Sequence, residues 1–198
     1  MARDQAGIVT RAQLLGAGVS HSAIGRALRA GELHRIHRGV YAAVAPELLT
    51  EEGHLLAALL AAGEGALLSH RTAAWRWRII PAPPSMITLA VPRRRKVEGL
   101  RLHISGHLRP GDSTHNGRFP TTTVARTLLD LATRYDRRAL LRALAEAEFQ
   151  HDLRPADVER TLRRGHAGSA NLRAALHATS PATARPRASS SAASADSS

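Results

Sequence analysis

Short polar and basic side chains gather in the segment between residues 20 and 29. His21, Ser22, Arg26 and Arg29 would occupy one side of a helix there, because residues three or four positions apart are neighbours on a helix surface. Imidazole, hydroxyl and guanidinium groups hydrogen-bond to base edges and to phosphate oxygens. The chemistry that this segment predicts is therefore recognition of a nucleic acid.

Two short helices must position these side chains. Thr10 is a good N-cap, and Gln13 follows at the spacing of a capping box, so a first helix should begin here and end near Gly16. Ser20 can cap a second helix that runs to about Ala30. The second helix would then be a recognition helix, whose first residues come nearest to the bases. Arg26 would reach a guanine edge or a phosphate, and Arg29 a phosphate.

A basic hairpin is expected directly after these helices. The run LHRIHRGVYAAV alternates and is rich in strand formers on both sides of Arg38 and Gly39. With the two helices it predicts a winged helix-turn-helix, the wing carrying Arg35 and Arg38. A helix pair without any role on DNA is the alternative. The predicted DNA-binding residues are Ser20, His21, Ser22, Arg26, Arg29, Arg35 and Arg38.

Charge supports a polyanionic partner, with one qualification. The net charge is +12, but Lys96 is the only lysine among 28 basic residues, and such an arginine bias is typical of GC-rich genomes. Positive charge is concentrated in residues 1–45, where six arginines face two acidic residues, and in residues 81–125, where seven basic residues face two acidic ones. One of these two regions is the predicted DNA-binding unit.

The remainder of the chain predicts a mixed α+β domain. We expect a helix over residues 50–62, a second helix after Ser69, two strands at 86–91 and 100–104, and a loop over 105–120. Helices capped by Thr123 and Asp136 and two further helices should follow. The fold class is thus α+β, with an N-terminal winged helix-turn-helix and a mixed α+β domain that has a small antiparallel sheet and a helical C-terminal part. The predicted divisions are 1–45, 46–178 and a disordered tail, 179–198.

A second basic run lies between the two expected strands. We interpret these strands as a hairpin, and its connection carries the four residues Arg93, Arg94, Arg95 and Lys96. A basic hairpin tip can reach the backbone of a duplex, so these residues form a second candidate phosphate contact. A solvated loop is the alternative interpretation.

Catalytic and metal motifs are absent from the sequence. No cysteine is present, so disulfides and thiolate zinc sites are excluded, and the eleven histidines form no His-Glu-x-x-His pattern. Neither a restriction-type nuclease motif nor a nucleotidyltransferase Asp-x-Asp pair occurs. His70 should be a hydrogen-bonded histidine at a helix start, and Asp130 should pair with Arg126 or Arg134. We expect no enzyme activity, no cofactor and no bound metal.

With no apolar run long enough for a bilayer and no signal peptide, we expect no membrane contact and a cytoplasmic protein.

Several blocks resemble a known family. The matching stretches are VTRAQLL, SHSAIGRALRAGELHRIHRGVYA, ALLSHRTAA, ITLAVPR and FPTTTVARTLLDLA, and together they span about residues 7–178. They resemble the abortive-infection AbiEi-like antitoxins, which are winged-helix regulators of type IV toxin–antitoxin systems. Relatives usually have a fuller first helix before the glycine that matches Gly7, and many continue into a nuclease-like domain.

The resemblance implies a transcriptional regulator that binds double-stranded DNA at its own operon promoter. It also implies a nucleotidyltransferase-like toxin as a functional and not necessarily physical partner, and it carries the recognition and wing roles onto the residues given above. The oligomeric state is left open, with a homodimer on DNA as one option. The alternative is a shortened relative of a nuclease-fused protein that serves only as a protein-interaction module.

Overall fold

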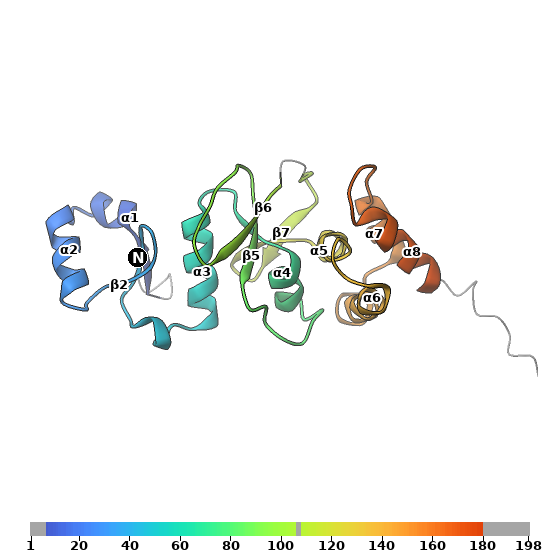
Figure 1. Cartoon of the computed structure of the whole chain (residues 1–198), viewed down its shortest axis with the longest axis horizontal. Coiled ribbons are helices and arrows are strands. Elements are labelled where there is room, and N and C mark those ends of the chain that lie inside the picture. Colours follow the sequence, from blue (N-terminus) through green and yellow to red (C-terminus); the bar gives the residue numbers. More distant parts are fainter. Residues whose placement is uncertain (1–6, 106–107, 180–198) are drawn as a thin grey trace, which may run out of the picture.

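The computed structural model describes residues 7–105 and 108–179. Within these residues the chain forms eight α-helices and two β-sheets, so the α+β class is confirmed. Figure 1 shows the elements in a row, with α2 at one end and α7 and α8 at the other. The first six residues of the predicted DNA-binding unit, and residues 180–198 of the predicted tail, lie outside the described residues.

The N-terminal unit consists of a small antiparallel sheet and two helices. Its elements are β1 (Ile8–Thr10), α1 (Arg11–Gly16), α2 (His21–Arg29), β2 (His34–His37) and β3 (Val40–Ala42). The strand order is β1-β3-β2. Thr10 and Gln13 form the expected capping box, and the Ser20 hydroxyl accepts from the backbone N–H of Ala23 at 3.2 Å. The short strand β1, which pairs with β3, was not predicted.

Helix α3 (Glu51–Ala62) joins the two parts of the molecule. Thr50 caps it as expected, and a short 3-10 turn over Pro46–Leu48 precedes it. Ala57 packs against the apolar side chains of the first sheet, whereas Leu55 and Ala58 pack against the second sheet. Apolar burial on two sides explains why this helix has an apolar surface nearly all round.

The second sheet has five strands and mixed direction. The strands are β4 (Leu67–Leu68), β5 (Ile87–Val91), β6 (Leu100–Ile104), β7 (Ser113–Asn116) and β8 (Phe119–Thr122), in the order β6-β5-β4-β8-β7. β5 and β6 are parallel, so the predicted hairpin at this position is wrong, and so is a purely antiparallel sheet. Apolar alternation reports a strand and its buried face, but it carries no information about direction.

The expected loop over residues 105–120 is also wrong in part. β7 and β8 form an antiparallel hairpin that turns at Gly117, which has a φ of 60°. β7 lies at the edge of the sheet, and three of its four residues are exposed. An exposed edge strand needs no apolar alternation, so its polar sequence gave no signal of a strand.

The helical C-terminal part agrees with the sequence analysis. The helices are α4 (His70–Arg76), α5 (Val124–Leu131), α6 (Arg137–His151), α7 (Pro155–Thr161) and α8 (Ser169–Thr179). Thr123 and Asp136 cap α5 and α6, and Pro155 occupies the first turn of α7. Leucines of α5 and α6, including Leu128 and Leu140, are buried in the largest apolar cluster. No helix among the described residues is long and apolar enough to cross a membrane.

Candidate nucleic-acid interface

One side of α2 is open to solvent. Ser20, His21 and Ser22 at its start are exposed, and so are Arg26 and Arg29 in its last turn, while Ile24 on the opposite side is 4% exposed. Neither arginine side chain forms an ion pair or hydrogen bond with another described residue. A guanidinium without a protein partner has all five of its N–H donors available for a ligand.

Hydrogen bonds order the first turn of α2. Ser20 serves as the cap, and its hydroxyl also lies 2.9 Å from that of Ser22. Arg11, at the start of α1, places Nη2 2.8 Å from His21 Nδ1. Arg11 was not among the predicted residues, although its position directly after a capped helix start is visible in the sequence. The Ser20 hydroxyl is therefore used to cap the helix. Arg11, which hydrogen-bonds to His21, adds a cation to the same surface.

The β2–β3 hairpin carries the other two predicted arginines. It turns at Arg38 and Gly39, and Gly39 has a φ of 78°, a conformation that favours glycine. Arg35 lies on β2 and Arg38 at the turn, and both are exposed. The predicted hairpin is therefore present, with its cations on the outside.

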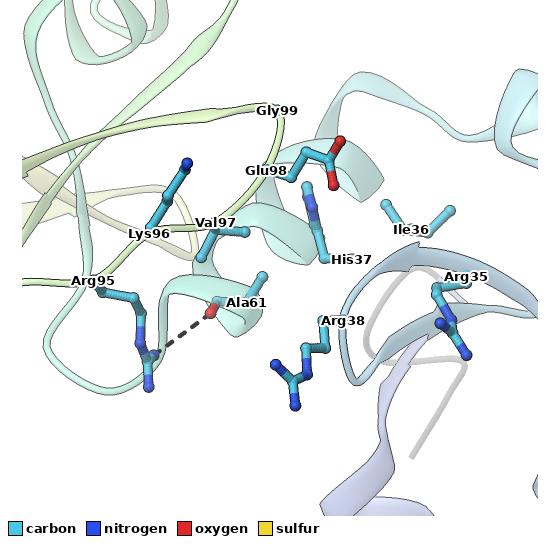
Figure 2. Close-up of a pocket in the computed structure, with 10 residues that line it drawn as sticks. All are labelled: Arg35, Ile36, His37, Arg38, Ala61, Arg95, Lys96, Val97, Glu98 and Gly99. Atoms are coloured by element: carbon cyan, nitrogen blue, oxygen red, sulfur yellow. Dashed lines mark hydrogen bonds between the residues drawn. The ribbon is translucent and has the colours of Figure 1, made fainter.

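The hairpin faces the connection between β5 and β6. A cavity of about 890 Å³ separates them, and it is lined by residues 35–38, Ala61 and residues 95–99. Figure 2 shows Arg38 and Arg95 on opposite sides of Ala61, with Lys96 further along the connection. The structure thus brings two members of the second basic run, Arg95 and Lys96, to the same cavity as Arg35 and Arg38.

The second basic run is divided among different surroundings. Arg95 donates from Nη1 to the carbonyl oxygens of Ala61, at 3.5 Å, and Ala62, which are in the last turn of α3. Arg93 and Arg94 are exposed and line a separate cavity of about 570 Å³. Because β5 and β6 are parallel, the run lies on a crossing connection rather than at a hairpin tip, and its four cations do not point to one place.

His37 lies beside this connection, across from Glu98. Burial lowers the pKa of the His37 ring below its ordinary value, and the nearby backbone of Glu98 opposes that change. Figure 2 shows the two residues side by side. The position of His37 beside Glu98 was not predicted, because these residues are 61 positions apart in the chain.

Comparison with known proteins gives a family match for the N-terminal unit. The family model described as "Transcriptional regulator, AbiEi antitoxin" matches residues 1–44. The resemblance stated above is thus confirmed for this segment, and the blocks beyond residue 44 remain outside the match. No curated protein gave a significant match.

A solved structure shares the fold. The crystal structure of the RV2827C protein from Mycobacterium tuberculosis aligns with a TM-score of 0.58 and 18% sequence identity. The alignment covers 89% of this chain and 78% of that protein. At this level of identity the likeness concerns the fold alone.

Proposed function

We propose that this chain is a DNA-binding transcriptional regulator and that its N-terminal unit is a winged helix-turn-helix. The observation that carries the proposal is the exposure of Arg26 and Arg29 on a capped helix beside a basic hairpin, with no partner among the residues that the structure describes. The match of residues 1–44 to a family of transcriptional regulators supports it. Buried versions of the same side chains would have argued against any contact with a duplex.

In the proposed complex, α2 enters the major groove with its first turn foremost. His21, oriented by Arg11, and Ser22 would contact base edges, and Arg26 and Arg29 would contact a guanine edge or phosphates. Arg35 and Arg38 would contact the backbone or the minor groove beside it. Phosphate neutralisation supplies most of the affinity in such complexes, and base contacts supply the choice of site.

The C-terminal part has a supporting role on DNA in this proposal. Lys96 lines the same cavity as the hairpin arginines and would extend the phosphate contacts beyond the N-terminal unit. Arg93 and Arg94 would contribute only where the duplex bends around this side. Arg95 is assigned to the end of α3, because its guanidinium already donates to two carbonyl groups there.

The regulator is proposed to be antitoxin-like and cytoplasmic. The family description names an AbiEi antitoxin, and we extend that role to this chain as opposition to a nucleotidyltransferase-like toxin encoded beside it. This opposition would act through transcription rather than through a stable complex. We propose no enzyme activity for the chain.

A gel-shift experiment tests the DNA-binding function. The probe is duplex DNA from upstream of the gene, and the double variant Arg26→Ala, Arg29→Ala is compared with Arg137→Ala, Arg138→Ala. The control pair removes two exposed arginines from the start of α6, at the far side of the molecule from α2 (Figure 1). We expect the first variant to bind at least about ten-fold more weakly, because two charged contacts are lost, and the control to bind like the wild type.

Two outcomes would contradict the proposal. Equal binding by both double variants would remove α2 from the interface. Failure of the wild type to shift any upstream duplex, at low salt as well, would favour the protein-interaction module instead.

A further inference from the structure

A second polar cavity lies in the C-terminal part, apart from the surfaces discussed above. Its volume is about 490 Å³, and its walls come from β5, β6, α5, the start of α4 and the connection between α7 and α8. Six of its lining residues carry titratable side chains: His70, His103, Arg126, Asp130, Arg134 and His166. Four segments distant in sequence therefore bring three histidines, two arginines and one carboxylate to one place.

Two of the three histidines approach the buried carboxylate of Asp130, and the third stacks on one of them. The rings of His70 and His103 stack, with centroids 4.0 Å apart and planes 21° from parallel. His70 Nδ1 lies 3.9 Å from Asp130 Oδ2, and His166 Nε2 lies 4.0 Å from Asp130 Oδ1, which is beyond hydrogen-bond length in both cases. His166 Nδ1 accepts a hydrogen bond from the backbone N–H of Gly168. A neutral His166 ring consequently carries its proton on Nε2 as a donor.

The carboxylates near the cavity are already paired with arginines. Arg126 donates from Nε to Asp130 at 2.9 Å and from Nη1 to Asp112 at 3.1 Å, and Arg163 also donates to Asp112. Arg134 is exposed at the cavity, and its guanidinium forms no hydrogen bond or ion pair with another residue in the described part of the chain. Three guanidinium groups therefore face two carboxylates, and the cavity has an excess of positive charge.

The surroundings keep the histidines neutral. Burial, followed by the charges of the neighbouring His103, Arg126, Arg134 and His166, lowers the pKa of His70 to about 3. Burial also lowers the pKa of His103 and His166, and nearby arginines add to the effect on both. Neutral rings leave the positive charge of Arg134 without a counter-charge and present N–H donors to whatever enters.

We propose that this cavity binds the phosphate group of a small phosphorylated molecule. A phosphate offers several acceptor oxygens and two negative charges, which suit imidazole N–H donors and a free guanidinium fork. The volume is in the range of small-molecule sites. The donors are histidine and arginine, since the hydroxyls of Ser105 and Thr133 already donate to the carbonyl groups of Val91 and Asp130.

A metal cation fits this cavity less well than an anion. The guanidinium groups of Arg126 and Arg134 would repel it, and no group of three His, Asp or Glu side chains among the described residues has the geometry to hold one. The backbone of His70 supports a functional cavity, because its φ of 50° is in the left-handed region that a bulky side chain rarely adopts. The site goes beyond the proposed DNA contacts and does not depend on them.

Histidine-ring NMR of the full chain tests the proposal. Inorganic phosphate, adenosine monophosphate and adenosine are titrated at constant ionic strength into protein with labelled histidines. We expect phosphate and adenosine monophosphate to shift the ring signals of His70, His103 and His166, and adenosine to leave them unchanged. Tighter binding of the nucleotide than of phosphate would support a ligand whose organic part also fills the cavity, and equal binding would support recognition of the phosphate alone.

The variant Arg134→Ala provides the matched measurement. Its side chain is exposed and has no described partner, so the variant should fold, and it should bind phosphate about ten-fold more weakly than the wild type. Arg138→Ala, also exposed, should bind like the wild type. The proposal is overturned if phosphate and the nucleotide shift none of the three rings, or if Arg134→Ala binds unchanged. It is overturned as well if only Zn²⁺, or only duplex DNA, produces the shifts.

Discussion

Arginine side chains have different roles in the N-terminal and C-terminal parts of this molecule. Arg26 and Arg29 on α2 are exposed and bond to no other side chain within residues 7–105 and 108–179, whereas Arg126 on α5 is 8% exposed and bonds to two carboxylates. The first pair adds little to folding and is free for a ligand. The second is part of the folded structure, because an unpaired buried charge is strongly unfavourable. Burial and partners, rather than residue type, separate binding arginines from structural ones.

The chain's basic composition therefore gives a poor guide to its binding surface. Of the two regions with excess positive charge, residues 81–125 include Arg95, which donates hydrogen bonds to carbonyl groups at the end of α3. The basic run also follows a crossing connection instead of a hairpin tip. Of that run, Arg95 and Lys96 line the cavity beside the hairpin arginines, and Arg95 already donates to the end of α3. The comparison leads to predictions for a buried arginine, a buried histidine and an exposed arginine that supports structure.

Arg126→Ala should have the largest effect on stability. It leaves Asp130 without its guanidinium partner and takes one of the two from Asp112, so we expect the free energy of unfolding in urea to fall by about 3–5 kcal/mol. Arg137→Ala, which removes an exposed arginine, should change it by less than about 0.5 kcal/mol. The double variant Arg126→Met, Asp130→Asn should recover part of the loss, because it removes both charges. Equal and small changes in the free energy of unfolding for Arg126→Ala and Arg137→Ala would contradict the distinction between structural and binding arginines.

His70 should make stability depend on pH. Its pKa is lowered to about 3 by burial and neighbouring cations, so the unfolded chain takes up a proton first as the pH falls below 6.5. The contribution of His70 to the free energy of unfolding should then decrease by about 1.4 kcal/mol for each unit by which the pH falls below 6.5. Burial raises the pKa of Asp130 to about 6, which acts in the opposite direction between about 6 and 3.8.

The variant His70→Gln isolates the histidine from this opposing group. Urea unfolding of both proteins is measured from about pH 7 to about pH 5. The stability advantage of the wild type over the variant should shrink with falling pH. A constant difference over this range would mean that the ring is not held neutral by its surroundings.

Arg95→Ala should have a smaller effect on stability and little effect on DNA binding, which would show that an exposed arginine need not contact DNA. The variant removes donors to the last carbonyl groups of α3, and we expect a loss of about 1 kcal/mol in the free energy of unfolding. DNA affinity should change little. Arg93→Ala, at an exposed neighbour in the same run, should leave stability unchanged. A large loss of DNA binding at unchanged stability would move Arg95 into the interface.

Local signals in the sequence predicted most of the helices. The caps Thr10, Thr50, Thr123 and Asp136 each begin a helix as expected, because capping depends only on residues within one turn. The direction of β6 relative to β5 depends on the path of the whole connection, and the edge strand β7 has no apolar pattern. Neither property is encoded within a few residues.

The candidate sites show the same limit. The α2 arginines follow one helix face and could be identified from spacing, and so could the Arg126–Asp130 pair, which is i,i+4 on α5. The cavity around Asp130 could not be identified, because His70, His103 and His166 come from separate segments. Their assembly requires the parallel pairing of β5 with β6 and the packing of α4 on α5.

The salt dependence of duplex binding tests the central claim most directly. The association constant of the wild type is measured against salt concentration and compared with that of the Arg26→Ala, Arg29→Ala variant and the Arg137→Ala, Arg138→Ala control. If α2 contacts phosphates, the logarithmic slope of the first variant should be shallower by about 1.8, which is about 0.9 for each contact, with an unchanged urea midpoint. The control should keep the wild-type slope, and identical slopes for all three proteins would show that the exposed face of α2 does not bind the duplex.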